Sequence, residues 1–170
     1  PVSVPGLRLN DAFIRGLSDK GVKHFPQSRV VKVGREKAEE FTAVIGHKPA
    51  QHTLVTKNII LASGMFWGRG LYADRRRIRE TIFDLPVHQP ENRDKWHSDN
   101  LLEPGGHTIN RAGVKIDPLF RPLNSSGHPL FRTLFAAGSI LAHNDWTRMK
   151  CGSGVSIASA YGAVKASLPF

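Results

Sequence analysis

The chain has 170 residues, with 24 lysines and arginines against 14 acidic residues, so its formal net charge at pH 7 is +10. A single cysteine excludes a framework of internal disulfides. No apolar run approaches the roughly 18 residues that a membrane-spanning helix needs. The length suits one domain with its own core. The arginines gather once, between Arg69 and Arg79, without a nucleic-acid-binding motif, so we expect a solvated basic surface rather than nucleic-acid binding.

The first part of the chain predicts a helix followed by a meander of strands. The helix has one apolar face, a cap at Asn10 or Asp11 and a stop at Gly21. We expect that face to pack into the core; its residues are Leu9, Phe13, Ile14 and Leu17. Strands are predicted at 21–25, 29–33, 41–45, 53–55 and 59–62, with turns at 34–37 and 46–49.

The remainder of the chain is loop-rich and ends in a strand and a helix. Prolines interrupt residues 65–129, where only 113–116 has the pattern of a short strand. Leu134–Ser139 is predicted as a buried strand beside 59–62, and after a polar loop Cys151 begins an alanine-rich helix. We expect the core residues of this helix to be Ile157, Ala160, Ala163 and Val164. The chain is thus predicted to be α/β, in three parts: 1–64, a lobe at 65–129, and 130–170.

Small residues end both buried strands and begin the last helix. Ser63 and Gly64 end one strand, and Gly138 and Ser139 end the other. The helix opens with Gly152, Ser153, Gly154, Val155 and Ser156. Glycines at a helix N-terminus let a ligand approach bare backbone N–H groups, which favour electron-rich atoms; an ordinary helix cap is the alternative. The G-x-G-x-x-A pattern at 68–73 does not directly follow a predicted strand, so we do not expect it to be a dinucleotide-binding motif.

Together these segments resemble the flavoproteins with two dinucleotide-binding domains, and most specifically the B-subunit family of anaerobic glycerol-3-phosphate dehydrogenase. The matching segments are Ser3–Leu9, Ala62–Phe66, Gly70-Leu71, Ile78–Glu80, Leu134–Ser139 and Cys151–Val155. The resemblance implies the C-terminal half of an FAD/NAD(P)-binding, Rossmann-like domain, with the phosphate-binding half upstream. We therefore expect a C-terminal portion that folds, carries no flavin by itself and self-associates.

The resemblance also implies the site. A flavin (FMN or FAD) would contact Val30 near its adenine end. It would also contact the residues named above at the two strand ends and at the start of the last helix. Val30 as a plain core valine is the alternative. His143 is a candidate base for the substrate hydroxyl, against a solvent-facing turn. Arg79 is a candidate for the substrate phosphate; the alternatives are a salt bridge with a nearby acid such as Glu80 and a docking surface for the partner subunit. The histidine spacing indicates no metal site.

The implied activity is oxidation of sn-glycerol 3-phosphate to dihydroxyacetone phosphate, with electrons passed to the quinone pool. The implied partners are a catalytic flavoprotein subunit and a membrane-bound iron–sulfur subunit, which would hold this protein at the cytoplasmic face of the membrane. From the charge alone, the alternative is a non-catalytic basic domain that binds an acidic protein or nucleic acid.

Overall fold

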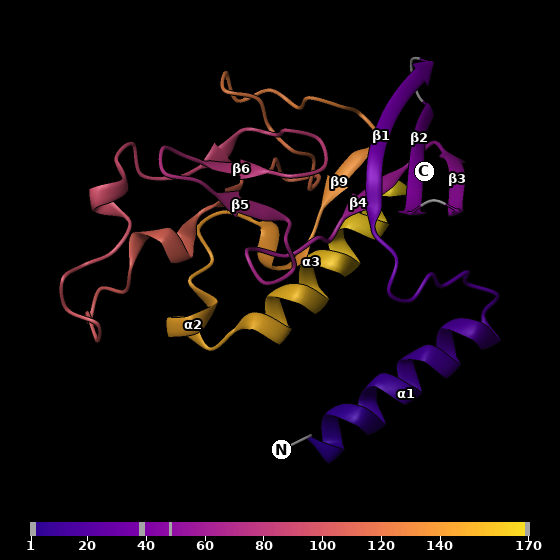
Figure 1. The fold of residues 1–170 in the computed structure, drawn as a ribbon, viewed down its shortest axis with the longest axis horizontal. Helices are drawn as coiled ribbons and strands as arrows, with labels where there is room; N and C mark the ends of the chain where they lie inside the picture. Colours follow the sequence, from indigo (N-terminus) through magenta and orange to yellow (C-terminus); the bar gives the residue numbers. More distant parts are fainter. Residues whose placement is uncertain (1–2, 38–39, 48, 169–170) are drawn as a thin grey trace.

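The first helix, α1 (Val4–Asp19), stands apart from the rest of the chain in the computed structural model (Figure 1), which describes residues 3–37, 40–47 and 49–168. It begins earlier than predicted because the Ser3 hydroxyl caps it, accepting the Gly6 N–H at 3.2 Å. Pro5 fits the first turn, where its missing N–H is not needed. The predicted caps at Asn10 and Asp11 are therefore wrong.

The C-terminal end of α1 is as predicted, but its packing is not. Gly21 follows the cap residue with a φ of 68°, a left-handed conformation that glycine adopts without strain. No residue of α1 is buried, and Phe13 is 63% exposed. The prediction that this apolar face packs into the core is therefore wrong.

A three-stranded antiparallel meander follows, in the order β1-β2-β3. Its strands are β1 (Val30–Lys37), β2 (Glu40–His47) and β3 (Ala50–Thr56). The meander is confirmed, but residues 34–37 and 46–47, predicted as turns, extend the strands. Residue 48 of the second predicted turn lies outside the described residues. Residues 21–25 form no strand, contrary to the prediction.

A parallel pair of strands carries the predicted small-residue ends. β4 (Ile59–Leu61) pairs with β9 (Leu134–Ala136), and Leu61 lies opposite Ala136. The prediction that these two strands lie side by side is confirmed. Among the described residues, β4 and β9 are the only named strands that pair in parallel. The structure therefore shows no wide doubly wound sheet in these residues. The fold is mixed α/β with small sheets.

The last helix, α3 (Gly152–Ser167), begins where predicted and runs along this strand pair (Figure 1). Ala163 packs with Phe135 and Ala137 in a small core cluster. Only Ser159 and Ala163 of the helix are buried. The prediction that Ile157, Ala160 and Val164 lie in the core is wrong: Ile157 and Val164 are 72% and 46% exposed, and Ala160 is exposed as well.

The region 65–129 is built from short elements that share the main core. They are β5 (Leu71–Ala73), β6 (Ile78–Glu80), β7 (Val87–His88), η1 (Arg93–Lys95), η2 (Thr108–Arg111) and β8 (Gly113–Val114). β5 pairs with β6 and β7 with β8, both antiparallel. One buried cluster joins Leu71 and Ile78 of this region to Phe41, Leu61 and Leu134.

Two short elements, η3 (Gly138–Ile140) and α2 (Trp146–Met149), connect β9 to α3. Among the described residues, no helix combines the length and apolar character needed to cross a membrane. The division of the chain into three parts stays a prediction.

Candidate functional site

Parallel pairing brings the ends of β4 and β9 together. Gly64 and Gly138 both have left-handed backbones, with φ of 74° and 79°, where a side chain would be strained. A Cβ on Gly64 would lie 3.6 Å from Ser139 Oγ, and one on Gly138 would lie 3.9 Å from Ser156 Oγ. Four predicted site residues from separate parts of the chain therefore meet here. We call Gly64, Gly138, Ser139 and Ser156 the strand-end site.

A serine that the sequence analysis missed holds this site against α3. Ser159 is 5% exposed, and its hydroxyl accepts the Gly138 N–H at 2.8 Å while donating to the Val155 carbonyl at 2.5 Å. Ser156 donates instead to the carbonyl of Gly152 in its own helix, at 2.8 Å. Ser159 is one of four serines in α3, so nothing in the sequence singles it out.

The N-terminus of α3 is open, as its glycines predicted. Cys151 is the cap residue, but its half-buried thiol makes no capping hydrogen bond. The Val155 N–H donates to the Cys151 carbonyl at 2.9 Å, whereas within the described chain the N–H groups of Gly152, Ser153 and Gly154 have no acceptor. A Cβ on Gly154 would meet nothing within 4 Å. Backbone donors are thus available at a helix end that favours electron-rich atoms.

A groove of about 890 Å³ runs between the meander and β4. Val30 and Ser63 both line it, as does Arg69 from the turn that follows β4. The Ser63 hydroxyl is buried and has no hydrogen-bond partner among the described residues. Val30 is half-buried rather than a core residue. This groove, which we call the meander groove, has mostly aliphatic walls with a few polar groups.

Arg79 lies in a different cavity. That cavity has a volume of about 620 Å³, and none of the residues of the strand-end site lines it. Arg79 forms an ion pair with Asp74 at 3.6 Å and lies over the ring of Tyr72, 5.7 Å from its centroid. The carboxylate of Glu80 points inward and accepts the N–H groups of Ile82 and Phe83 at 2.8 and 2.7 Å. The alternative prediction, a salt bridge between Arg79 and a nearby acid, is therefore confirmed, but the acid is Asp74 and not Glu80.

His143 is exposed and belongs to a histidine pair. Its φ is 69°, and its ring centroid lies 4.2 Å from that of His88. Burial, followed by the positive charges of His143 and Lys115, lowers the pKa of His88 below its ordinary value. Across the residues that the structure describes, no group of three or more His, Cys, Asp or Glu side chains could hold a metal ion.

Asp145, two residues after His143, was not predicted as a site residue. It is 2% exposed, and its Oδ1 accepts the Arg148 N–H at 3.2 Å, which caps α2. This buried cap fixes the loop that leads from the histidine pair to the N-terminus of α3. A single aspartate between Asn144 and Trp146 has no spacing that marks it in the sequence.

Comparison with known proteins now places the chain. A family model described as FAD binding domain matches residues 1–155. The chain belongs to this FAD-binding family. No solved structure matches it.

The curated relatives of this FAD-binding chain include proteins named as the B subunit of anaerobic glycerol-3-phosphate dehydrogenase. The chain is 31% identical over 163 residues to the relative from Halobacterium salinarum, whose name is qualified as probable, and the match covers 96% of this chain and 38% of that protein. It is 31% identical to the relative from Pectobacterium carotovorum (94% and 37% covered) and 27% identical to the one from Vibrio cholerae (97% and 37% covered). The resemblance to this family is confirmed. The chain spans little more than a third of the length of these relatives.

Proposed function

We propose that this chain is the part of a flavoprotein dehydrogenase subunit that holds the ring end of an FAD. The observation that carries the proposal is the strand-end site, where two left-handed glycines and two serine hydroxyls meet beside α3, whose open N-terminus is rich in glycine. Flavin, when bound, supplies a hydride acceptor.

The residues present fit such a group. Glycines at 64 and 138 leave room for close approach, and Gly154 faces open space. The free N–H groups of Gly152, Ser153 and Gly154 would favour the electron-rich pyrimidine end of the ring and stabilise negative charge there. Ser139, where related flavoproteins often have an acid, offers a neutral hydroxyl to the ribityl chain.

The meander groove supports FAD rather than FMN. Its volume of about 890 Å³ suits a ligand the size of a nucleoside. Aliphatic residues such as Val30 would hold the planar base, while Ser63 and Arg69 would offer a hydroxyl and a guanidinium group to sugar and phosphate. The unpartnered Ser63 hydroxyl fits this role, because a buried hydroxyl without a partner is costly.

The proposed reaction of the whole protein is oxidation of sn-glycerol 3-phosphate to dihydroxyacetone phosphate, with electrons passed toward quinone. In this proposal His143 accepts the proton of the substrate hydroxyl. Arg79, from the cavity described above, binds the substrate phosphate. The names of the relatives support a role as one subunit among several. We propose a catalytic flavoprotein subunit and an iron–sulfur subunit as its partners, the latter holding it at the cytoplasmic face of the membrane.

Flavin retention tests the proposal. In the complete natural protein, Gly154→Val should remove flavin, because the branched side chain fills the space beside the free N–H groups, and it should leave circular dichroism unchanged. Gly16→Val in α1 is the matched control, since a Cβ there also meets nothing within 4 Å. The measurement is the flavin absorbance per protein after gentle purification. If the Gly154 variant retains a full complement of flavin, the open start of α3 is only a helix end.

A further inference from the structure

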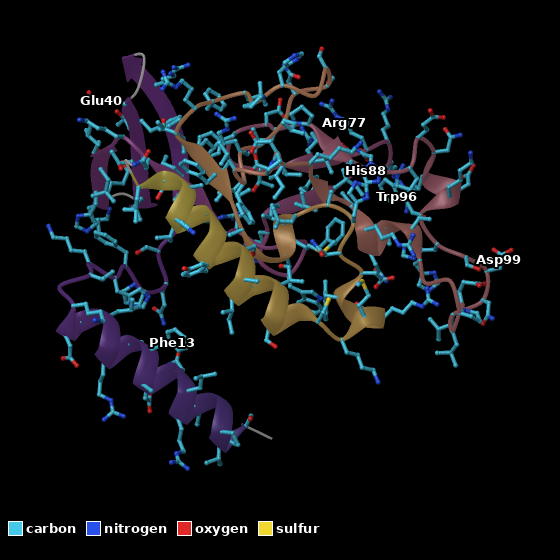
Figure 2. All side chains as sticks on the ribbon, turned by 180° about the vertical axis from the view of Figure 1, so that it is seen from behind. Phe13, Glu40, Arg77, His88, Trp96 and Asp99 are labelled. Atoms are coloured by element: carbon cyan, nitrogen blue, oxygen red, sulfur yellow. The ribbon has the colours of Figure 1, made fainter. Side chains whose placement is uncertain are left out.

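The strongest concentration of unpaired charge lies on the β5–β6 hairpin, residues Leu71–Glu80, which we call the basic hairpin. Its inner residues Leu71, Ile78 and Glu80 are each 2% exposed and anchor it in the core. Its turn carries three consecutive arginines, all exposed: Arg75, Arg76 and Arg77. Arg77 lies near the edge of the molecule in Figure 2.

The backbone of this turn is fixed. Asp74 Oδ1 accepts the N–H groups of Arg76 and Arg77 at 2.7 and 2.8 Å, and the Asp74 N–H donates to the Arg77 carbonyl at 3.0 Å. The N–H groups of Arg77 and Arg76, and then the charges of Arg79 and Arg77, lower the pKa of Asp74, so the carboxylate that holds the turn stays ionised at neutral pH. The three arginines are therefore presented from a rigid support.

No acidic residue of the described chain forms an ion pair with any of these three arginines. Asp74 pairs with Arg79 at 3.6 Å, and the Glu80 carboxylate is buried against backbone N–H groups. The side chains of Arg75, Arg76 and Arg77 make no hydrogen bond or ion pair with any residue that the structure describes. The hairpin thus concentrates part of the net charge of +10 at one projecting point.

We propose that the basic hairpin docks an acidic segment of a partner protein. This deepens the subunit role proposed above and rests on it. Guanidinium groups bind carboxylates through two parallel hydrogen bonds, and arginine is enriched in protein interfaces. A membrane surface fits less well, because the turn offers no apolar side chain for insertion. Nucleic acid fits less well, because Tyr72, the one aromatic residue of the hairpin, is already occupied by Arg79.

A labelled polyglutamate peptide is the probe for the acidic partner. Fluorescence anisotropy at low salt compares the wild-type chain with R75Q/R76Q/R77Q, which keeps the Asp74 backbone bonds. The control R8Q/R15Q/K20Q removes the same charge from two exposed residues of α1 and from its exposed C-cap residue, Lys20. We expect the hairpin variant to lose about tenfold in affinity, because it loses three exposed ion pairs and each contributes a small amount. The control should lose less than about threefold. Added salt should abolish the difference.

Equal losses in the two variants would overturn the proposal, because binding would then follow net charge alone. So would a hairpin-specific loss seen only with phosphatidylserine vesicles or a single-stranded oligonucleotide. In the complete protein, the three hairpin substitutions should leave flavin content unchanged. A protein that binds polyglutamate through the hairpin and carries no flavin would support this inference and refute the proposed flavin site, so the two failures are distinguishable.

Discussion

The contact between Phe120 and Gly162 determines how closely α3 can approach the strand pair. A Cβ on Gly162 would overlap the Phe120 ring. The ring cannot easily withdraw, because Phe120 has a φ of 61° and its backbone is held at both ends: its N–H donates to Asp117 at 2.9 Å, and its carbonyl accepts the Ala136 N–H at 2.8 Å. Gly162→Ala therefore forces the ring or the helix to move.

The size of the effect follows from two opposing contributions. Carbon atoms in contact normally lie about 3.5–4.0 Å apart, so the ring must shift by roughly 1 Å or more. Overpacking of this kind costs about 1–3 kcal/mol, and the better helix propensity of alanine offsets up to about 1 kcal/mol. We expect Gly162→Ala to lower the free energy of unfolding by about 1–2 kcal/mol, measured by urea denaturation.

Gly154→Ala is the matched control in the same helix, since its new methyl group meets nothing within 4 Å. It should leave the free energy of unfolding unchanged or raise it by up to about 1 kcal/mol. Replacing Phe120 by leucine should make Gly162→Ala less costly, with a coupling energy of at least about 0.5 kcal/mol in a double-mutant cycle. If Gly162→Ala and Gly154→Ala behave alike, the ring does not limit the approach of α3 and the reasoning is refuted.

Two other measurements address the strand-end site and the histidine pair. Ser159→Ala should cost about 0.5–1.5 kcal/mol in thermal or urea unfolding, the net value of one hydrogen bond, because it leaves the half-buried Gly138 N–H without its acceptor. Replacing the exposed Ser156 by alanine is the control and should cost less. The lowered pKa of His88 means that, just below its ordinary pKa of about 6.5, unfolded chains bind more protons than folded ones. The free energy of unfolding should therefore rise with pH through that range. His88→Asn should flatten this dependence, and an unchanged slope would contradict the assignment to His88.

The elements predicted best from the sequence were those whose ends are marked by small residues. The strands ending at Leu61 and Ala136 are short apolar runs bounded by small residues, and the helix after Cys151 is long and rich in alanine. Their parallel pairing brought Gly64 and Gly138 together as expected. The start of α1 was missed because Pro5 followed by glycine usually signals a loop, whereas the Ser3 cap makes it a first helical turn.

Burial and pairing were harder to predict. Periodicity shows which residues share a helix face but not what covers that face, and so Phe13 and Ile157 were wrongly placed in the core. Arg79 and Glu80 are neighbours in sequence, yet successive residues of a strand point to opposite faces, so they do not pair. Ser159 and Asp145 are buried polar residues that each accept a backbone N–H, and no spacing or motif distinguishes them in the sequence.

An isolated helix as short as α1 is marginally stable in water, because most helical stability in proteins comes from packing an apolar face. Since α1 has no buried residue, its backbone amides can exchange with solvent while the remainder stays folded. The slope of the unfolding free energy against denaturant concentration scales with the surface that unfolding exposes. It will therefore reflect the unfolding of the meander, the strand pair and the lobe, and not that of α1. The cooperative folding unit of this chain is therefore shorter than the polypeptide itself.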